Sequence, residues 1–239
     1  MITIFTIPRP FVGEFDHIQR NALRSWLLLK PRPEILLFGA EEGVAEVANE
    51  LNIPVFLVER NDEGTPLVND ALDKARSMAA NDILVMANCD NIYLSDFIPA
   101  VQKVARAFPR FLMIGRRWDI KVDNLIDFDS DWENRIRQKV AETGTLHHKA
   151  AVDFLVFRDG GWWGEIPPFA VGRTTYDSWL VARTWKQGIP TVDVTWTAMV
   201  VHQDHALKGI RHNREAHRNR ELHGDAGRGG VGHANWRTA

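Results

Sequence analysis

Short apolar runs alternate with amphipathic segments through the first 119 residues, and this alternation constrains the fold more than any other feature. Five β-branched or aromatic runs predict strands at 2–7, 35–38, 54–58, 83–87 and 111–115. Between them, apolar side chains recur at helical spacing over 14–29, 44–51, 67–78 and 97–108. This order predicts an α/β fold, a three-layer sandwich with a mostly parallel central sheet and helices on both faces.

The second half of the chain is less regular. We expect helices beginning near residue 132 and over 175–187, and strands at 152–157, 191–194 and 198–201. No Pro-, Gly- or Ser-rich linker divides the first 200 residues, so residues 1–205 are predicted to form a single domain. Residues 206–239 are polar and rich in Arg, His and Gly, and are expected to form a tail with a short helix and then a mobile segment.

Composition excludes several classes of partner. The 239 residues include 29 basic and 31 acidic side chains, a net charge of -2, so we expect no nucleic acid partner. The single cysteine, Cys89, has no partner for an internal disulfide, which fits a reducing compartment. No apolar run is long enough to cross a bilayer, so we predict no transmembrane segment and a cytoplasmic protein.

The carboxyl ends of the predicted strands carry polar and charged residues. Ligands of parallel α/β sheets bind at this edge. Asp90 follows the buried run 83–87, where a carboxylate suits Mg²⁺ or Mn²⁺ bridging a nucleotide diphosphate. An aspartate here equally fits a turn or a helix cap, and the position alone does not separate these interpretations.

The order of motifs resembles the GT-A fold of nucleotide-sugar glycosyltransferases, with a family 2-like layout. Asn88-Cys89-Asp90 resembles a degenerate DxD motif in which only the last acid remains. Gly160–Gly164 is similar to the glycine-rich acceptor loop, and Thr175-Tyr176-Asp177 matches the Asp of the xED motif. His202 resembles the late histidine that completes the metal site in this family. The resemblance covers residues 1–205, and no single motif is specific.

This resemblance implies a glycosyltransferase that moves a sugar from a nucleotide-sugar donor to a carbohydrate or other hydroxyl acceptor. Residues 1–119 would form the nucleotide-binding half and residues 120–205 the acceptor half. A Mn²⁺ or Mg²⁺ ion would be held by Asp90 and His202. Candidate nucleotide-binding residues are Pro8, Arg9, Glu41, Thr65, Asn69, Asn88 and Asp90.

Two of these assignments have alternatives in the same residues. Asp177 is the candidate catalytic base for an inverting single displacement, but Thr174-x-x-Asp177 also fits a helix capping box. His202 and His205 follow a strand with Asp204 between them, a pattern that also fits part of a two-His-one-carboxylate iron site or ordinary surface histidines.

The acceptor side is assigned from aromatic and acidic residues. Trp162 and Trp163 lie between glycines, and aromatic faces stack on the apolar face of sugars, so they are predicted to form an acceptor platform together with Asp153. The alternative is a hydrophobic plug over the core.

Other functions also stay open at this stage. A nucleotidyltransferase acting on a sugar phosphate would need a Gly-rich, basic loop after the first strand, and residues 8–13 match it poorly. A non-catalytic carbohydrate-binding relative is the third interpretation. The acceptor of a transferase could be a growing polysaccharide, as in polysaccharide biosynthesis, a lipid-linked sugar or a small molecule.

Overall fold

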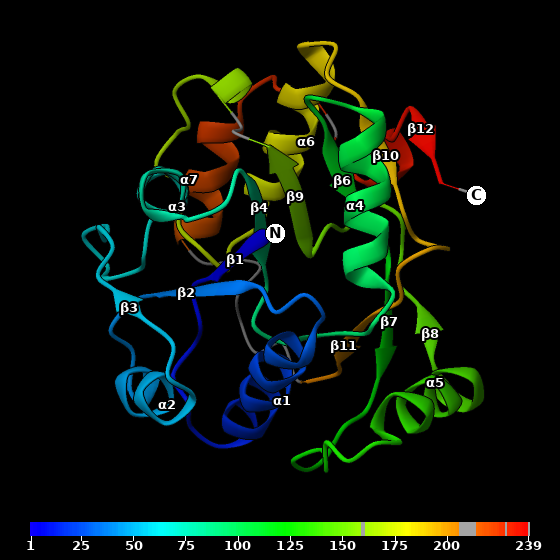
Figure 1. Ribbon diagram of the computed structural model, residues 1–239. Helices are drawn as coiled ribbons and strands as arrows, with labels where there is room; N and C mark the ends of the chain where they lie inside the picture. The colour runs from blue at the N-terminus through cyan, green and yellow to red at the C-terminus, as the bar shows by residue number, and fades with distance from the viewer. Residues whose placement is uncertain (159–160, 206–213, 228, 239) are drawn as a thin grey trace.

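The computed structural model describes residues 1–158, 161–205, 214–227 and 229–238. An eight-stranded sheet runs through its centre in the order β12-β10-β6-β9-β4-β1-β2-β3 (Figure 1). Its strands are β1 (Ile2–Thr6), β2 (Glu34–Phe38), β3 (Val55–Phe56), β4 (Ile83–Ala87), β6 (Leu112–Ile114), β9 (Phe154–Arg158), β10 (Thr191–Asp193) and β12 (Trp236–Arg237). A second sheet has the order β5-β11-β7-β8, from β5 (Asn91–Tyr93), β7 (Arg117–Ile120), β8 (Thr145–Leu146) and β11 (Val200–Gln203).

The large sheet is parallel except at β9. Every other neighbouring pair in it is parallel, whereas β9 runs antiparallel to both β4 and β6, with Val156 opposite Val85 and Met113. The completely buried run of β4 reflects cover on both faces of the sheet. The predicted mostly parallel α/β sheet is confirmed.

Helices cover both faces of the large sheet, as Figure 1 shows. They are α1 (Glu14–Leu28), α2 (Val44–Leu51), α3 (Val68–Met78), α4 (Phe97–Ala107), α5 (Trp132–Thr143), α6 (Tyr176–Lys186) and α7 (Arg214–His223), with 3₁₀ turns η1 (Gly161–Trp163) and η3 (Val231–His233). Consecutive residues of a strand point to opposite faces. Ile4 therefore packs in the core under α1, α2 and α4, and Phe5 packs in the core under α3 and α6.

The second sheet continues from the carboxyl ends of the first. β5 follows β4 after the turn 88–90, and β7 follows β6 after residues 115 and 116. Helix α5 covers one face of this sheet through Trp132, Ile136 and Val140. The ends of β4 and β6, two of the strand ends expected to carry the site, therefore lie where the two sheets meet.

The structure differs from the prediction in two places. The strands β5, β7 and β8 were not predicted, because each has two to four residues and too few alternations to give a period. The expected mobile segment in the tail is wrong for residues 229–238, since β12 pairs in parallel with β10 and the Asn235 side chain accepts a hydrogen bond from Thr191 N–H. The short helix expected there is α7.

Candidate active site

Asp90 lies beside two histidines at the edge between the sheets. Its Oδ2 lies 3.5 Å from His202 Nε2 and 3.3 Å from His205 Nε2. The pairing of β11 with β5 places His202 opposite Asn91, and the backbone N–H of Gln203 donates to the Asp90 carbonyl. The sheet register therefore brings together residues that are more than 110 positions apart in the sequence.

This cluster fits a divalent cation. The three ligand atoms are close enough together to share one ion. Asp90 Oδ1 is buried and has no hydrogen-bond partner among the described residues, which is a costly state for a carboxylate oxygen. One carboxylate and two imidazoles suit Mn²⁺ and similar transition ions better than Mg²⁺, which prefers oxygen ligands.

The surrounding charges set the protonation of the cluster. Burial by itself would raise the pKa of Asp90, but hydrogen bonds from His202 and His205 outweigh it and hold that pKa well below its ordinary value. Burial would likewise lower the pKa of His202, yet Asp119 and Asp90 raise it to about 9. A metal ion that binds His202 must therefore displace a proton from this ring.

Asp119 forms a second layer behind His202. Its Oδ1 lies 3.1 Å from His202 Nδ1 and accepts a 2.8 Å hydrogen bond from Arg117 Nε. Its Oδ2 lies 2.5 Å from His147 Nδ1. Burial raises the pKa of Asp119, but hydrogen bonds from His202, Arg117 and His147 and the charge of Arg117 lower it further than burial raises it.

Asn88 and Asp153 connect the degenerate motif to β9. Asn88 Nδ2 donates to Asp153 Oδ1 over 3.0 Å, and the same carboxylate oxygen accepts a hydrogen bond from Arg117. The amide of Asn88 therefore binds the carboxylate of Asp153, the residue just before β9, whereas an aspartate at position 88 would repel it. Burial, more than any other factor, raises the pKa of Asp153.

Asp177 lies in the first turn of α6, after Thr175, whose φ of 90° is rare for a side chain with a branched β-carbon. Burial raises the pKa of Asp177 to about 6, against hydrogen bonds from the backbone N–H groups of Ser178 and Val152. Burial, with the charges of Asp177, Asp153 and Asp90, raises the pKa of the Tyr176 hydroxyl. The backbone bonds mean that Asp177 is compatible with both the base and the cap interpretation.

Arg9 lies near the cluster of Asp90, His202 and His205 through the ring of Phe15. Gln19 accepts a hydrogen bond from Arg9 N–H and donates one to the Arg9 carbonyl, which fixes the Pro8–Pro10 segment. The Arg9 guanidinium lies 4.8 Å from the centre of the Phe15 ring, and Phe15 packs edge-on against His205 at 4.9 Å. The ring of Phe15 therefore lies between Arg9 and His205.

The other predicted nucleotide residues line the neighbouring strand ends. Glu41, after β2, forms an ion pair of 2.9 Å with Arg60. Thr65 N–H donates to Asn61 Oδ1 within a tight turn. Asn69, in the first turn of α3, has a buried Oδ1 without a partner among the described residues.

The predicted tryptophan platform is wrong. Trp162 and Trp163 are 7% and 1% exposed and pack in the core under α6. Both indole N–H groups donate to Thr184 Oγ1. Neither face is available to a sugar, so the hydrophobic plug that the sequence also allowed is what the structure contains. Gly160 of the glycine-rich loop lies outside the described residues.

Sequence reasoning missed several members of the site. It treated His205 as secondary to His202 and left out His147. Arg117 and Asp119 share a face of β7, but that strand is too short to be predicted from the sequence. His147 had no signal in the sequence, since only the pairing of β7 with β8 brings it to Asp119.

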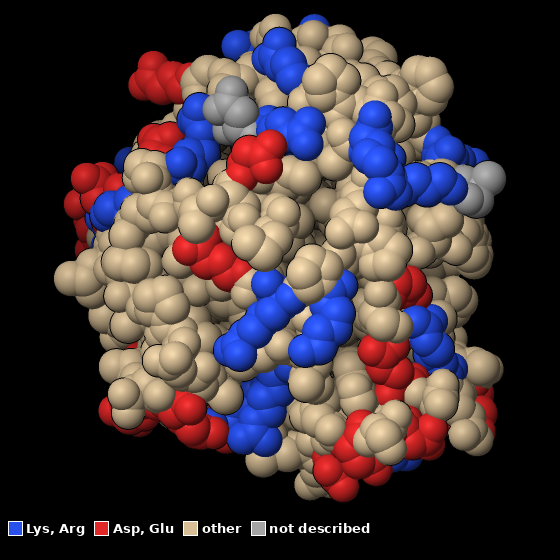
Figure 2. Space-filling view, in the orientation of Figure 1, with Lys and Arg blue, Asp and Glu red and all other residues tan. Residues whose placement is uncertain are grey.

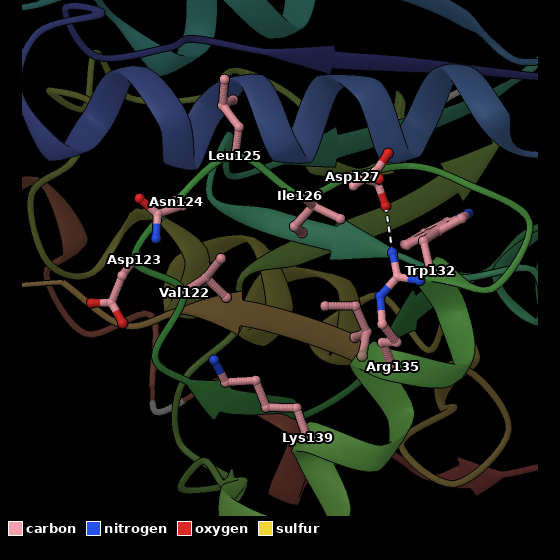
Figure 3. Close-up of a pocket in the computed structure, with 10 residues that line it drawn as sticks. Val122, Asp123, Asn124, Leu125, Ile126, Asp127, Trp132, Arg135 and Lys139 are labelled. Atoms are coloured by element: carbon pink, nitrogen blue, oxygen red, sulfur yellow. Dashed lines mark hydrogen bonds between the residues drawn. The ribbon is translucent and has the colours of Figure 1, made fainter.

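A groove beside α5 lies apart from this cluster. Figure 3 shows the segment 122–127 lying alongside α5, with Arg135 donating to the Asp127 carbonyl over 2.7 Å. None of the predicted site residues lines this groove. In Figure 2 acidic side chains gather at the lower right, where α5 lies, and basic side chains gather over α1, so this face presents no field of a single sign.

Comparison with solved structures decides the fold family. The chain superimposes on Staphylococcus aureus TarS residues 1–349 in complex with UDP-GlcNAc with a TM-score of 0.58 and 10% identity, covering 88% of this chain and 60% of that one. It superimposes on GalNAc-T7 with UDP, GalNAc and Mn²⁺ with a TM-score of 0.57 and 14% identity, covering 89% and 44%. The chain has the GT-A fold. This GT-A chain spans less than two thirds of the length of either structure.

Two other comparisons found no match. No family model matches the chain, and no curated protein matches it either. Within residues 1–158, 161–205, 214–227 and 229–238, no helix has the length and apolar character needed to cross a membrane.

Proposed function

We propose that this chain is a glycosyltransferase that transfers a sugar from a nucleotide-sugar donor to a hydroxyl acceptor. The observation that carries the proposal is the convergence of Asp90, His202 and His205 at the carboxyl edge of a GT-A sheet. Both structures named above were solved with UDP or a UDP-sugar, and one of them also with Mn²⁺. These observations support a nucleotide-sugar donor and a divalent metal.

Asp90, His202 and His205 would hold the metal ion, with Mn²⁺ favoured by the two imidazoles. When bound, such an ion neutralises the charge that develops on the leaving diphosphate. Arg9 lies beside His205 through Phe15 and would add a fixed positive charge at the same edge. The donor nucleotide would extend from there toward Glu41, Thr65 and Asn69.

Asp177 would act as the base in an inverting displacement. Its pKa of about 6 leaves the carboxylate ionised at neutral pH while keeping it a stronger base than an exposed aspartate. It would remove the proton of the acceptor hydroxyl as that oxygen attacks the anomeric carbon from the face opposite the leaving diphosphate. Asp153 remains the proposed acceptor-side acid.

Thermal unfolding with a panel of nucleotides and nucleotide sugars tests the donor and the metal together. We expect at least one nucleoside diphosphate to raise the Tm with Mn²⁺ present, and Asp90→Ala to remove the part of the shift that depends on Mn²⁺. Asp73→Ala, an exposed acid on α3, is the matched control. If no nucleotide stabilises the wild type, the proposed donor is wrong.

Product analysis tests the mechanism separately. Once a donor is found, the anomeric configuration of the product by NMR distinguishes inversion from retention. Asp177→Asn should lower kcat by several orders of magnitude with the nucleotide shift in Tm unchanged. Turnover by Asp177→Asn at the wild-type rate would exclude Asp177 as the base.

A further inference from the structure

The pairing of β7 with β11 places Asp119 beside His202. In the parallel pair β7 and β11, Asp119 is the register partner of His202. The two side chains lie on the same face, and Asp119 Oδ1 is 3.1 Å from His202 Nδ1. The other ring nitrogen, Nε2, faces Asp90.

Asp119 differs from Asp90 in how its oxygens are used. Arg117 Nε and His202 Nδ1 approach Oδ1, and His147 Nδ1 approaches Oδ2. Both oxygens of Asp119 are therefore engaged, whereas Asp90 keeps a buried Oδ1 without a partner among the described residues. Asp119, with both oxygens engaged, is suited to hold His202 in place. Asp90, with one oxygen free of partners among the described residues, is suited to bind the ion.

A different grouping of the same residues places Asp119, His202 and Asp204 within reach of one ion. Asp204 is exposed, and an ion there would have to compete with Arg117 and His147 for the oxygens of Asp119. The geometry favours the group around Asp90.

We infer that Asp119 is a positioning residue for the ring of His202. Nδ1 lies 3.1 Å from Asp119 Oδ1 without an aligned hydrogen bond. With Nε2 directed to a metal ion, Nδ1–H would turn to donate to Asp119. Arg117 and His147 hold Asp119 in that orientation from β7 and from the residue after β8. A carboxylate behind a metal-binding imidazole fixes its tautomer and raises its basicity. The inference rests on the metal site of the proposed function.

Manganese binding to the full chain without nucleotide tests this role by a readout other than turnover. We expect Asp119→Ala to weaken Mn²⁺ binding roughly ten- to a hundred-fold, measured by calorimetry. Asp119→Asn, which keeps one acceptor oxygen, should weaken it less. Asp204→Asn is the matched control and should bind Mn²⁺ like the wild type.

Imidazole ¹⁵N NMR of the zinc-loaded chain gives a second readout, because Zn²⁺ is diamagnetic. In the wild type, His202 should bind through Nε2 alone, and in Asp119→Ala a second form should appear. If Asp119→Ala fails to fold, His147→Gln replaces it, because the His147 side chain is one third exposed. This variant should weaken Mn²⁺ binding several-fold.

The outcomes separate the inference from the proposal on which it rests. A wild type that binds no Mn²⁺ overturns the metal site and this inference with it. A wild type that binds Mn²⁺, with Asp119 and His147 variants that bind equally well, overturns only the positioning role. Weakening by Asp204→Asn as large as that by Asp119→Ala would instead place the ion in the other group.

Discussion

At the residue scale, four aspartates of the candidate site experience opposite surroundings. Hydrogen bonds from histidines and, for Asp119, the charge of Arg117 hold the pKa of Asp90 and Asp119 low, while burial raises the pKa of Asp153 and Asp177. Separation of this kind divides similar side chains into different roles. In the proposed site, Asp90 stays ionised to bind the metal ion and Asp119 stays ionised to hold His202. The pKa of Asp177, about 6, lies close to neutral pH.

The raised pKa of Asp177 predicts that Asp177→Asn lowers activity and raises stability. The pKa of Asp177 is about 6 in the folded chain and 3.8 for an ordinary aspartate, so the cost of burying its charge is absent below pH 4 and fully present above pH 6. Asp177→Asn should therefore raise the free energy of unfolding at pH 7 by about 1–3 kcal/mol while abolishing turnover. Wild-type kcat/KM should fall as the pH drops through 6.

Urea unfolding at pH 4 and pH 7 checks the stability part of this prediction. The difference between Asp177→Asn and wild type should be present at pH 7 and small at pH 4. Asp73→Asn, at an exposed position on α3, should show no such dependence. Equal pH profiles for Asp177→Asn and wild type would contradict the burial of this charge.

Two tryptophans at opposite extremes of exposure test the corrected assignment. Trp163 is buried and hydrogen-bonded, so Trp163→Ala should cost about 3–5 kcal/mol of unfolding free energy. Trp196 is 71% exposed, and Trp196→Ala should change it by less than about 0.5 kcal/mol. Chemical denaturation measures both. A small loss for Trp163→Ala would reopen its assignment to the acceptor side.

At the scale of elements, α7 and the segment after it hold the start of α6. Asn219 on α7 bonds both backbone groups of Ala170, and the Thr175 hydroxyl donates to the Asn219 carbonyl. Gly229 N–H donates to Ser178 Oγ. The turn that carries Asp177 is therefore supported by residues that follow position 213 in the sequence.

The close approach of Gly229 to the backbone of α6 predicts the effect of a larger residue at this position. A Cβ there would lie 2.1 Å from the Ser178 carbonyl oxygen and 2.8 Å from Ala182 N, both backbone atoms of α6. Gly229→Ala should cost about 1–3 kcal/mol, because neither can move without shifting the helix. Gly232→Ala meets only the flexible Lys149 side chain and is the control. Equal melting temperatures for the two variants would contradict the packing.

How much the sequence predicts also depends on the element. The runs of β1, β2 and β4 and the helices between them were predicted because their periods are long enough to read. The position of Asp90 at a strand end followed from them. His147 and His205 could not be placed, since their proximity to Asp119 and Asp90 depends on pairings between strands of two to four residues. Trp162 and Trp163 were wrongly predicted to be exposed because glycines flank them in the sequence.

At the scale of the whole molecule, the tail completes the core under α3 and α6. Ala216 and Val231 are buried, and Glu215 joins Asn61 to Arg173 across two loops. Removal of residues 206–239 should therefore lower the Tm strongly and speed hydrogen exchange in the loop 61–65 and the turn 170–175. Mass spectrometry of exchange checks this. An unchanged Tm would show that the tail is a dispensable cover.

The antiparallel strand β9 has a consequence for how such a chain can be made and rearranged. It comes from the proposed acceptor half, yet it lies between β4 and β6 of the proposed nucleotide half. A fragment that ends at residue 119 lacks the strand that joins β4 to β6. During synthesis the sheet cannot close until residue 158 has left the ribosome, and the long separation of these pairs favours slow folding. An exchange of acceptor halves between relatives, in evolution or in the laboratory, must bring along a strand that fits between β4 and β6 of the recipient.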